Sequence, residues 1–193
     1  MNYNKATDNE LIRACLKNKR PAQQELFTRF SYMVKGICLR YSRDADEAED
    51  LLQESFIRIF TKLDTFTDKG PLGAWIRKIT VNTALEIYRK HSTMQRHLTI
   101  VKAESDPNPK TSDSAIEQLQ LEDLLLKIQQ LPNGYRTIFN LYAIEGYNHP
   151  EIAQMLDISE GTSKSQYSRA RTLLREMIDR ESHVERIIWS HAT

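Results

Sequence analysis

The chain has 193 residues with 27 basic and 26 acidic side chains, so its formal net charge of +1 shows no overall bias toward a polyanionic or polycationic partner. Hydrophobic residues make up 40% of the chain, while Gly and Pro number only 6 each, a composition that favours long helices over strands and turns. No apolar run approaches the roughly 20 residues that a membrane span needs, so we expect no membrane insertion. These properties predict an all-helical protein of two small domains.

Cys15 and Cys38 both lie among apolar neighbours in helical patterns. No further cysteine could complete a zinc site, and nothing before Cys15 resembles a secretory segment. The 5 histidines share no ligand spacing. We therefore expect two reduced core cysteines in a cytoplasmic protein that needs no metal or cofactor.

The first 41 residues predict two helices. Thr7 and Glu10 have the spacing of a capping box, and apolar residues follow at helical intervals as far as Asn18. Pro21 restarts the chain, and a broad apolar stripe then runs to Tyr41 with a period of about 3.6 residues. This stripe indicates a buried face in the core of an N-terminal domain.

An acidic helix is predicted next, from Asp44 to Phe60. Acidic residues crowd its first two turns, where the helix dipole favours them, and an apolar stripe runs from Ala48 to Leu63. One interpretation is a well-capped surface helix. The other is an acidic, partly apolar face that docks on a basic partner.

The charge then reverses, after a loop over residues 64–70. Between residues 71 and 102, six basic side chains stand against the single acid Glu86, with Trp75 and Tyr88 interleaved among them. Lys78, Asn82 and Arg89 fall near one outward line, at steps of four and seven. Such a face suits single-stranded nucleic acid, because cations follow phosphates, rings stack on bases and an amide pairs with a base edge. The alternative is a solvated helix with Trp75 packed in the core.

A flexible linker over residues 94–113 is predicted, because periodicity disappears there and the segment is polar with two prolines. It separates an N-terminal helical domain, residues 1–93, from a C-terminal helical domain, residues 114–180. Ser114 and Glu117 have capping-box spacing at the start of the second domain. The tail, residues 181–193, is expected to form a short helix to which we assign no function.

The second domain contains a helix-turn-helix pattern between Asn148 and Arg171. Apolar residues from Ile152 to Leu156 make one stripe, and residues 157–161 break the period. The following helix keeps an inward stripe, so we expect its outer face to contact nucleic acid. The candidate contact residues are Thr162, Ser163, Lys164, Ser165, Gln166, Ser168, Arg169 and Arg171.

The ordered set of motifs is similar to the bacterial RNA polymerase sigma factors, above all to the extracytoplasmic-function group of the sigma-70 family. The resemblance covers roughly residues 8–92 and 115–178. In the first domain it rests on the motif at 46–56, on Trp75 to Ile79, on Asn82 to Ala84, and on Arg89 with Lys90. In the second it rests on Leu131-Pro132, Tyr135-Arg136, Glu145 to Tyr147, Glu151 to Ala153, and Gly161 to Arg171.

The resemblance implies a factor that binds core RNA polymerase, selects promoter DNA and helps to open it, with no catalytic chemistry of its own. Such factors often have an anti-sigma factor. The residues implied to dock on the coiled coil of the largest polymerase subunit are Asp46, Glu47, Glu49, Asp50, Leu52, Gln53 and Phe56. Those implied to meet the downstream promoter element as it opens are Trp75, Arg77, Lys78, Asn82, Arg89 and Lys90. The helix from Thr162 is implied to recognise the upstream element in duplex form.

Two departures from the family pattern concern the helix-turn-helix. His149-Pro150 stands where the family often has an aromatic and an acidic residue, and Ser163 occupies a position commonly filled by a branched apolar side chain. Both residues bear on the orientation of the recognition helix, so the sequence does not determine which bases this helix contacts.

Two other functions compete with this interpretation. Residues 130–178 alone would permit a helix-turn-helix regulator with an N-terminal partner-binding domain, although the basic helix before the linker argues against it; co-purification with core RNA polymerase would separate the two. A nucleic-acid enzyme would need a carboxylate cluster, or a nucleophile with its base, and the sequence shows neither.

Overall fold

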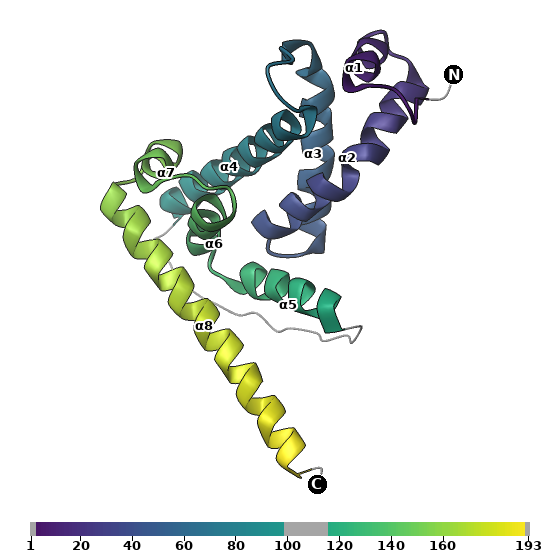
Figure 1. The fold of residues 1–193 in the computed structure, drawn as a ribbon. Coiled ribbons are helices and arrows are strands. Elements are labelled where there is room, and N and C mark those ends of the chain that lie inside the picture. Colours follow the sequence, from purple (N-terminus) through teal and green to yellow (C-terminus); the bar gives the residue numbers. More distant parts are fainter. Residues whose placement is uncertain (1–2, 99–115, 192–193) are drawn as a thin grey trace. The chain divides into compact units, whose positions relative to one another are not determined.

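The fold is that of a computed structural model, which describes the backbone of residues 3–98 and 116–191 and the side chains within 3–90 and 123–180 (Figure 1). All regular structure in these ranges is helical, which confirms the all-helical prediction. The chain divides into two compact units, Met1–Gln95 and Arg96–Thr193, and each is described by itself. Across the described ranges, no helix combines the length and the apolar composition that crossing a bilayer requires.

The N-terminal unit is built on α2, which packs against α1 on one side and α3 on the other (Figure 1). Its elements are α1 (Asp8–Leu16), α2 (Arg20–Tyr41), α3 (Ala45–Thr61), the short 3₁₀ helix η1 (Leu63–Thr65) and α4 (Leu72–Leu98). The capping box predicted before α1 is present: Glu10 N donates to Thr7 Oγ1 at 3.3 Å, and Thr7 N donates to Glu10 Oε2 at 2.9 Å.

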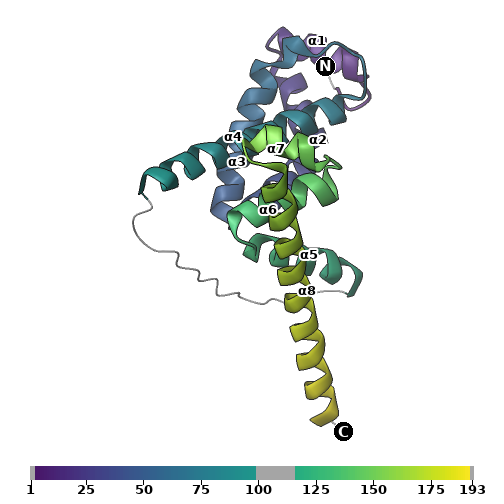
Figure 2. The same ribbon diagram turned by 90° about the vertical axis from the view of Figure 1, so that its left-hand side faces the viewer.

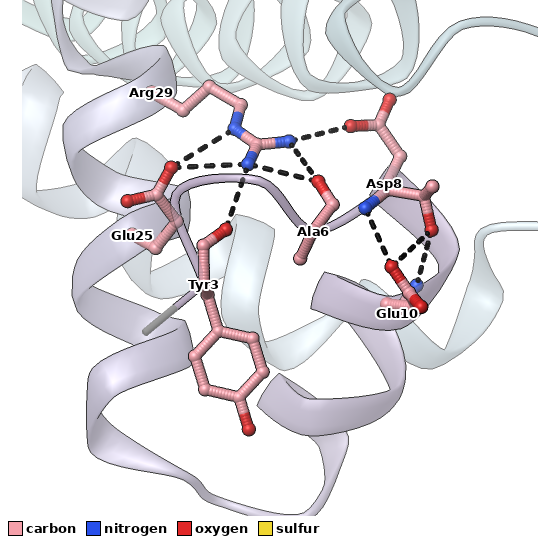
Figure 3. Close-up of polar contacts among 7 residues, drawn as sticks. Tyr3, Ala6, Asp8, Glu10, Glu25 and Arg29 are labelled. Carbon is pink, nitrogen blue, oxygen red and sulfur yellow. Dashed lines mark hydrogen bonds and ion pairs between the residues drawn. The ribbon is translucent and has the colours of Figure 1, made fainter. Parts of the chain in front are cut away.

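A guanidinium on α2 ties the segment before α1 to the rest of this unit (Figure 3). Arg29 Nη1 and Nη2 each donate to the Ala6 carbonyl oxygen at 3.2 Å, and Nη2 also donates to the Tyr3 carbonyl at 3.4 Å. Asp8 and Glu25 accept from the same group at 3.1 Å each. The five donors of an arginine suit such a convergence of acceptors, and the sequence pattern gave no sign of it.

The core of the N-terminal unit is formed by the predicted apolar stripes. Leu26 and Ile37 of α2 and Ile59 of α3 are fully buried, or nearly so. The buried free thiols of Cys15 and Cys38 agree with the expected core placement. Desolvation by burial raises the pKa of Cys15 to about 11 and that of Cys38 to about 12.

The C-terminal unit gathers its helices around the first half of α8. Its elements are α5 (Ile116–Gln130), α6 (Asn133–Phe139), the π-helical η2 (Asn140–Ile144), α7 (His149–Leu156) and α8 (Glu160–His191). The core contains Ile128, Leu131, Ala170 and Leu174, with further apolar side chains packed against it. Gly146, with φ of 81°, turns the chain between η2 and α7 in a conformation that few other residues tolerate.

Two helices continue past the predicted boundaries. Helix α4 continues to Leu98, past the loss of periodicity at Met94, because good helix formers such as Gln95 and Arg96 extend a helix without any apolar stripe. The expected separate tail helix is instead the end of α8, which runs unbroken to His191 (Figure 2) because no Gly or Pro interrupts it after Gly161. The rest of the predicted linker, and the predicted cap at Ser114, lie outside the described residues.

Candidate nucleic-acid interface

The helix-turn-helix is closed by caps on both of its helices. Asn148 and Glu151 form a capping box at the start of α7, and Asp157 ends that helix in the left-handed region with φ of 53°. Ser159 Oγ then accepts from Thr162 N at 3.0 Å, which caps the first turn of α8. The motif predicted between Asn148 and Arg171 is therefore present, with α8 as the recognition helix.

Only part of the predicted contact set lies on the outer face of α8. The side chains that project to solvent are Lys164, Ser165, Ser168, Arg169 and Arg171. Thr162 and Gln166 are half-buried, and the amide oxygen of Gln166 is shielded from solvent. Ser163 is 0% exposed, so its expected place on the outer face is wrong. With about 100° of rotation per residue, Ser163 falls on the same inward side as Ala170 and Leu174.

Three exposed cations in the first half of the recognition helix contact neighbours in the same unit. Lys164 Nζ pairs with Glu160 Oε1 at 2.6 Å, and its hydrogen bond lowers the pKa of that carboxyl group. Arg171 lies 5.8 Å from the centroid of the Tyr167 ring, and Arg169 Nη1 donates to Tyr135 Oη at 3.4 Å. The two arginines, whose aromatic partners are neutral, therefore present positive charge along the outer face, as binding to phosphates requires.

Beneath this face lies a group of rings that we refer to as the aromatic cluster: Phe139, Tyr142, His149 and Tyr167. Tyr142 stacks on His149 with centroids 4.4 Å apart and planes 17° apart, and Tyr167 lies 4.5 Å from Tyr142. Phe139 stacks on Tyr167 at 6.2 Å. The cluster joins α6, η2, α7 and α8, so it supports the recognition helix from behind.

The second candidate interface is the outward line predicted on α4. Lys78, Arg89 and Lys90 are exposed, and Asn82 is half-buried, as is Arg77. Trp75 is also half-buried and packs edge-on against Phe66, with centroids 5.8 Å apart. One side of the Trp75 ring therefore packs within the unit, while the rest remains accessible to solvent.

Asn82 and Arg89 come together in an open cavity of about 290 Å³ between α3 and α4, which we refer to as the basic hollow. Its lining residues are Arg58, Lys62, Ile79, Asn82, Thr83, Glu86 and Arg89. The predicted residues Trp75, Arg77, Lys78 and Lys90 do not line it.

The charges in the hollow are organised by Arg58. Its Nε donates to Glu54 Oε1 at 2.7 Å, and its Nη1 is hydrogen-bonded to Glu86 Oε2, which lowers the pKa of Glu86. Arg89 Nε donates to the Leu85 carbonyl at 3.3 Å. With Glu86 engaged by Arg58, Lys62 and Arg89 give the hollow a net positive charge beside the Asn82 amide. A phosphate and an adjoining base edge are ligands that such a set can bind.

Sequence reasoning missed Arg58 and Lys62 because they stand at the end of the acidic helix, where the pattern was dominated by anions. A signal was present: the two cations follow the last acid of α3, Glu54, at steps of four. Spacing of this kind places them on one helix face, but only the crossing of α3 with α4 shows that this face meets Asn82.

The third candidate surface, the acidic face, lies on the solvent side of α3. Its members are Asp46, Glu49, Asp50 and Gln53, all exposed, together with Ile57, whose side chain is 60% exposed although it is apolar. Glu47 is turned toward Arg43, whose Nε donates to it at 2.7 Å. The sequence did not single out Ile57, which continues the line of Asp46, Asp50 and Gln53.

Two predicted docking residues belong to the core instead. Leu52 and Phe56 are buried, and the Phe56 ring packs on Phe27 with centroids 4.6 Å apart. Both lie on the apolar stripe that turns α3 toward α2, so neither can form part of an outward docking face.

Comparison with known families decides the identity of the chain. The family described as Sigma-70 region 2 matches residues 26–93, and the family described as Sigma-70, region 4 matches residues 121–174. The chain belongs to the sigma-70 family. Region 2 of this sigma-70 protein thus holds the acidic face and the basic hollow, while region 4 holds the aromatic cluster and the outer face of the recognition helix.

Several known proteins similar to the chain are RNA polymerase sigma factors, among them one of the extracytoplasmic-function (ECF) group. It is 33% identical over 154 residues to the probable RNA polymerase sigma factor RfaY of Xanthomonas campestris pv. campestris, covering 76% of this chain. It is 31% identical over 169 residues to the ECF RNA polymerase sigma factor SigE of Mycolicibacterium smegmatis, covering 84% of this chain. The matches span 38% of the first relative and 63% of the second.

A solved structure has a similar fold. The sigma factor RpoE of Bartonella quintana, in complex with the anti-sigma factor NepR, is 24% identical and aligns with a TM-score of 0.50. The alignment covers 81% of this chain and 96% of that one. This likeness concerns the fold of the sigma-70 protein and not its partners.

Proposed function

We propose that this protein is a sigma factor that binds core RNA polymerase and directs promoter recognition, promoter opening and the start of transcription. The observation that carries the proposal is that one chain presents two cationic surfaces on separate units: the outer face of the recognition helix and the basic hollow. A regulator that only binds duplex DNA needs the first surface but has no use for the second.

In this proposal the recognition helix binds the upstream element as duplex DNA. Arg169 and Arg171 are held along the helix by aromatic partners and contact phosphates, which fix the register on the DNA. Lys164 and Ser165 precede them on the outer face and meet the base edges. Ser163 makes no DNA contact, because it is buried.

The basic hollow binds the downstream element as its strands separate. Lys62 and Arg89 bind phosphates, and the Asn82 amide pairs with an exposed base edge, as at other single-strand sites. Lys78 and Lys90 extend the positive charge along α4. Because unpaired bases reach the amide only after the duplex opens, binding here favours the open state over the closed one.

The acidic face docks on a basic surface of the polymerase, with Ile57 supplying an apolar contact in the line of Asp50 and Gln53. The chain then acts by binding in the cytoplasm, and the core enzyme forms every phosphodiester bond. The family resemblance also implies control by an anti-sigma factor, which native co-purification would reveal.

Transcription in vitro tests the proposal. We expect core enzyme plus the protein to initiate at discrete sites on genomic templates, where core enzyme alone does not. Asp50→Arg is expected to abolish both co-purification with core enzyme and this initiation. Asp179→Arg makes the same charge change at an exposed position of α8 and is the matched control. Failure of the unaltered protein to bind core enzyme would refute the proposal and favour the regulator instead.

A further inference from the structure

The two departures from the family pattern, His149 and Ser163, are hydrogen-bonded to each other. His149 Nδ1 lies 2.9 Å from Ser163 Oγ, across the interface between α7 and α8. The family-like combination, an aromatic ring against a branched apolar side chain, would fill this space without a directional contact. A hydrogen bond requires particular distances and angles, whereas apolar packing does not.

The histidine ring is itself held in place. Tyr142 stacks on one face of it, and Tyr167 meets it in a T-shaped contact with centroids 5.8 Å apart. Because Tyr142 belongs to η2 and Tyr167 to α8, the ring plane is fixed by elements on either side of α7. Nδ1 therefore points at Ser163 from a ring with little freedom to turn.

Ser163 is well placed to set the rotation of the recognition helix. It lies in the first turns of α8 and is fully buried, so its hydroxyl group has no access to water. At about 100° per residue, Ser168 and Thr172 lie roughly opposite Ser163, and Lys164 lies about a quarter turn from it. Rotation of α8 about its axis would stretch the hydrogen bond to His149. The same rotation would move the side chains of the outer face relative to the DNA.

We propose that His149 is a positioning residue for recognition of the upstream element: through Ser163 it fixes the rotation of α8, and so determines which side chains meet the base edges. The inference rests on the proposed function. His149 is half-buried within the aromatic cluster and does not itself need to contact DNA.

Three variants separate this role from simple packing. His149→Phe keeps a ring in the cluster but removes the nitrogen, and leaves the buried hydroxyl without its partner. Ser163→Ala removes only the hydroxyl group and carries little risk of misfolding. The double variant removes both polar partners, which is close to neutral for stability when the shape is kept.

The test is a selection of random duplex DNA by holoenzyme reconstituted from core enzyme and the full chain, with the melting temperature measured in parallel. For both single variants we expect enrichment of the upstream element to fall about tenfold, which is the effect of losing discrimination at one base pair. Enrichment of the downstream element should not change and serves as the internal control. We expect the double variant to recover its melting temperature but not its upstream preference.

Recovery of both properties in the double variant would overturn the proposal, because packing alone would then explain the pair. An unchanged upstream preference in Ser163→Ala would also overturn it, even if His149→Phe failed to fold. If holoenzyme with the unaltered chain enriches neither element, the proposed function itself has failed, which is a separate and recognisable result.

Discussion

Removal of the Arg29 guanidinium is expected to destabilise the N-terminal unit by about 2 kcal/mol. A hydrogen bond from a charged donor contributes about 1.5–3 kcal/mol, and Arg29 holds two backbone carbonyls in addition to two carboxylates. Its side chain is 25% exposed, so solvent screening reduces the total, and contacts that share one group do not add. Arg29→Ala also releases the segment at residues 3–6 and uncovers the Tyr3 ring, which is otherwise buried.

The measurement is unfolding by denaturant, with the fluorescence of Trp75 as the signal. The chain has 2 tryptophans, so a Trp189→Phe background leaves a reporter in the N-terminal unit alone. Arg43→Ala is the matched control: Arg43 also pairs with a carboxylate, Glu47, but it is 66% exposed and holds no distant segment, so we expect a change within about 0.5 kcal/mol. Equal losses for the two variants would refute the assignment of Arg29 as a structural tie.

Other predictions concern the two cationic surfaces and the thiols. Asn82→Ala is expected to reduce transcription from duplex promoters more than from a pre-melted template while polymerase binding persists; equal loss on both templates would contradict a role in strand opening. Arg171→Ala is expected to weaken binding evenly across sequences and to lower the salt slope by about 1, as titrations at several salt concentrations will show; a sequence-dependent loss would argue against a phosphate contact. Burial raises the pKa of Cys15 to about 11 and of Cys38 to about 12 from an ordinary 9.0, so unfolding releases protons in alkali. The stability that the buried thiols contribute is thus present below pH 9 and is lost as the pH rises through 11 to 12. We also expect both thiols to resist a disulfide reagent at pH 8 until denaturant is added, and rapid labelling of the native protein would contradict their burial.

Much of the fold could be predicted from sequence because it depends on local rules. The capping box at Thr7 and the apolar stripes of α2 and α3 each follow from the spacing of a few neighbouring residues. The end of α4 could not be predicted in the same way, since a helix persists through polar residues once it has begun. The stripe already places Phe56 among the inward residues of α3, and only the family resemblance implies a docking role for it; the structure agrees with the stripe, because Phe56 is buried.

The candidate sites depend on pairs that are far apart in sequence. Arg58 meets Glu86 only because α3 crosses α4, and Ser163 meets His149 only because α7 packs against α8. The composition of the recognition helix indicated a polar outer face, but its rotation is set by these tertiary contacts. The spacing of Asn82 and Arg89 on one helix is enough to place them on one line, whereas Lys62 joins them in the basic hollow only through a second helix.

The unbroken course of α8 gives this protein a mechanical property. Its 32 residues, at 1.5 Å each, make a rod about 48 Å long that has the DNA-facing turns at one end and the chain terminus near the other. A tilt of about 5° at the first turns displaces the far end by about 4 Å. If the first turns of α8 bind the promoter as proposed, a molecule bound at the C-terminal end of the helix would sense, or impose, a change of its angle on the DNA without contacting the DNA itself.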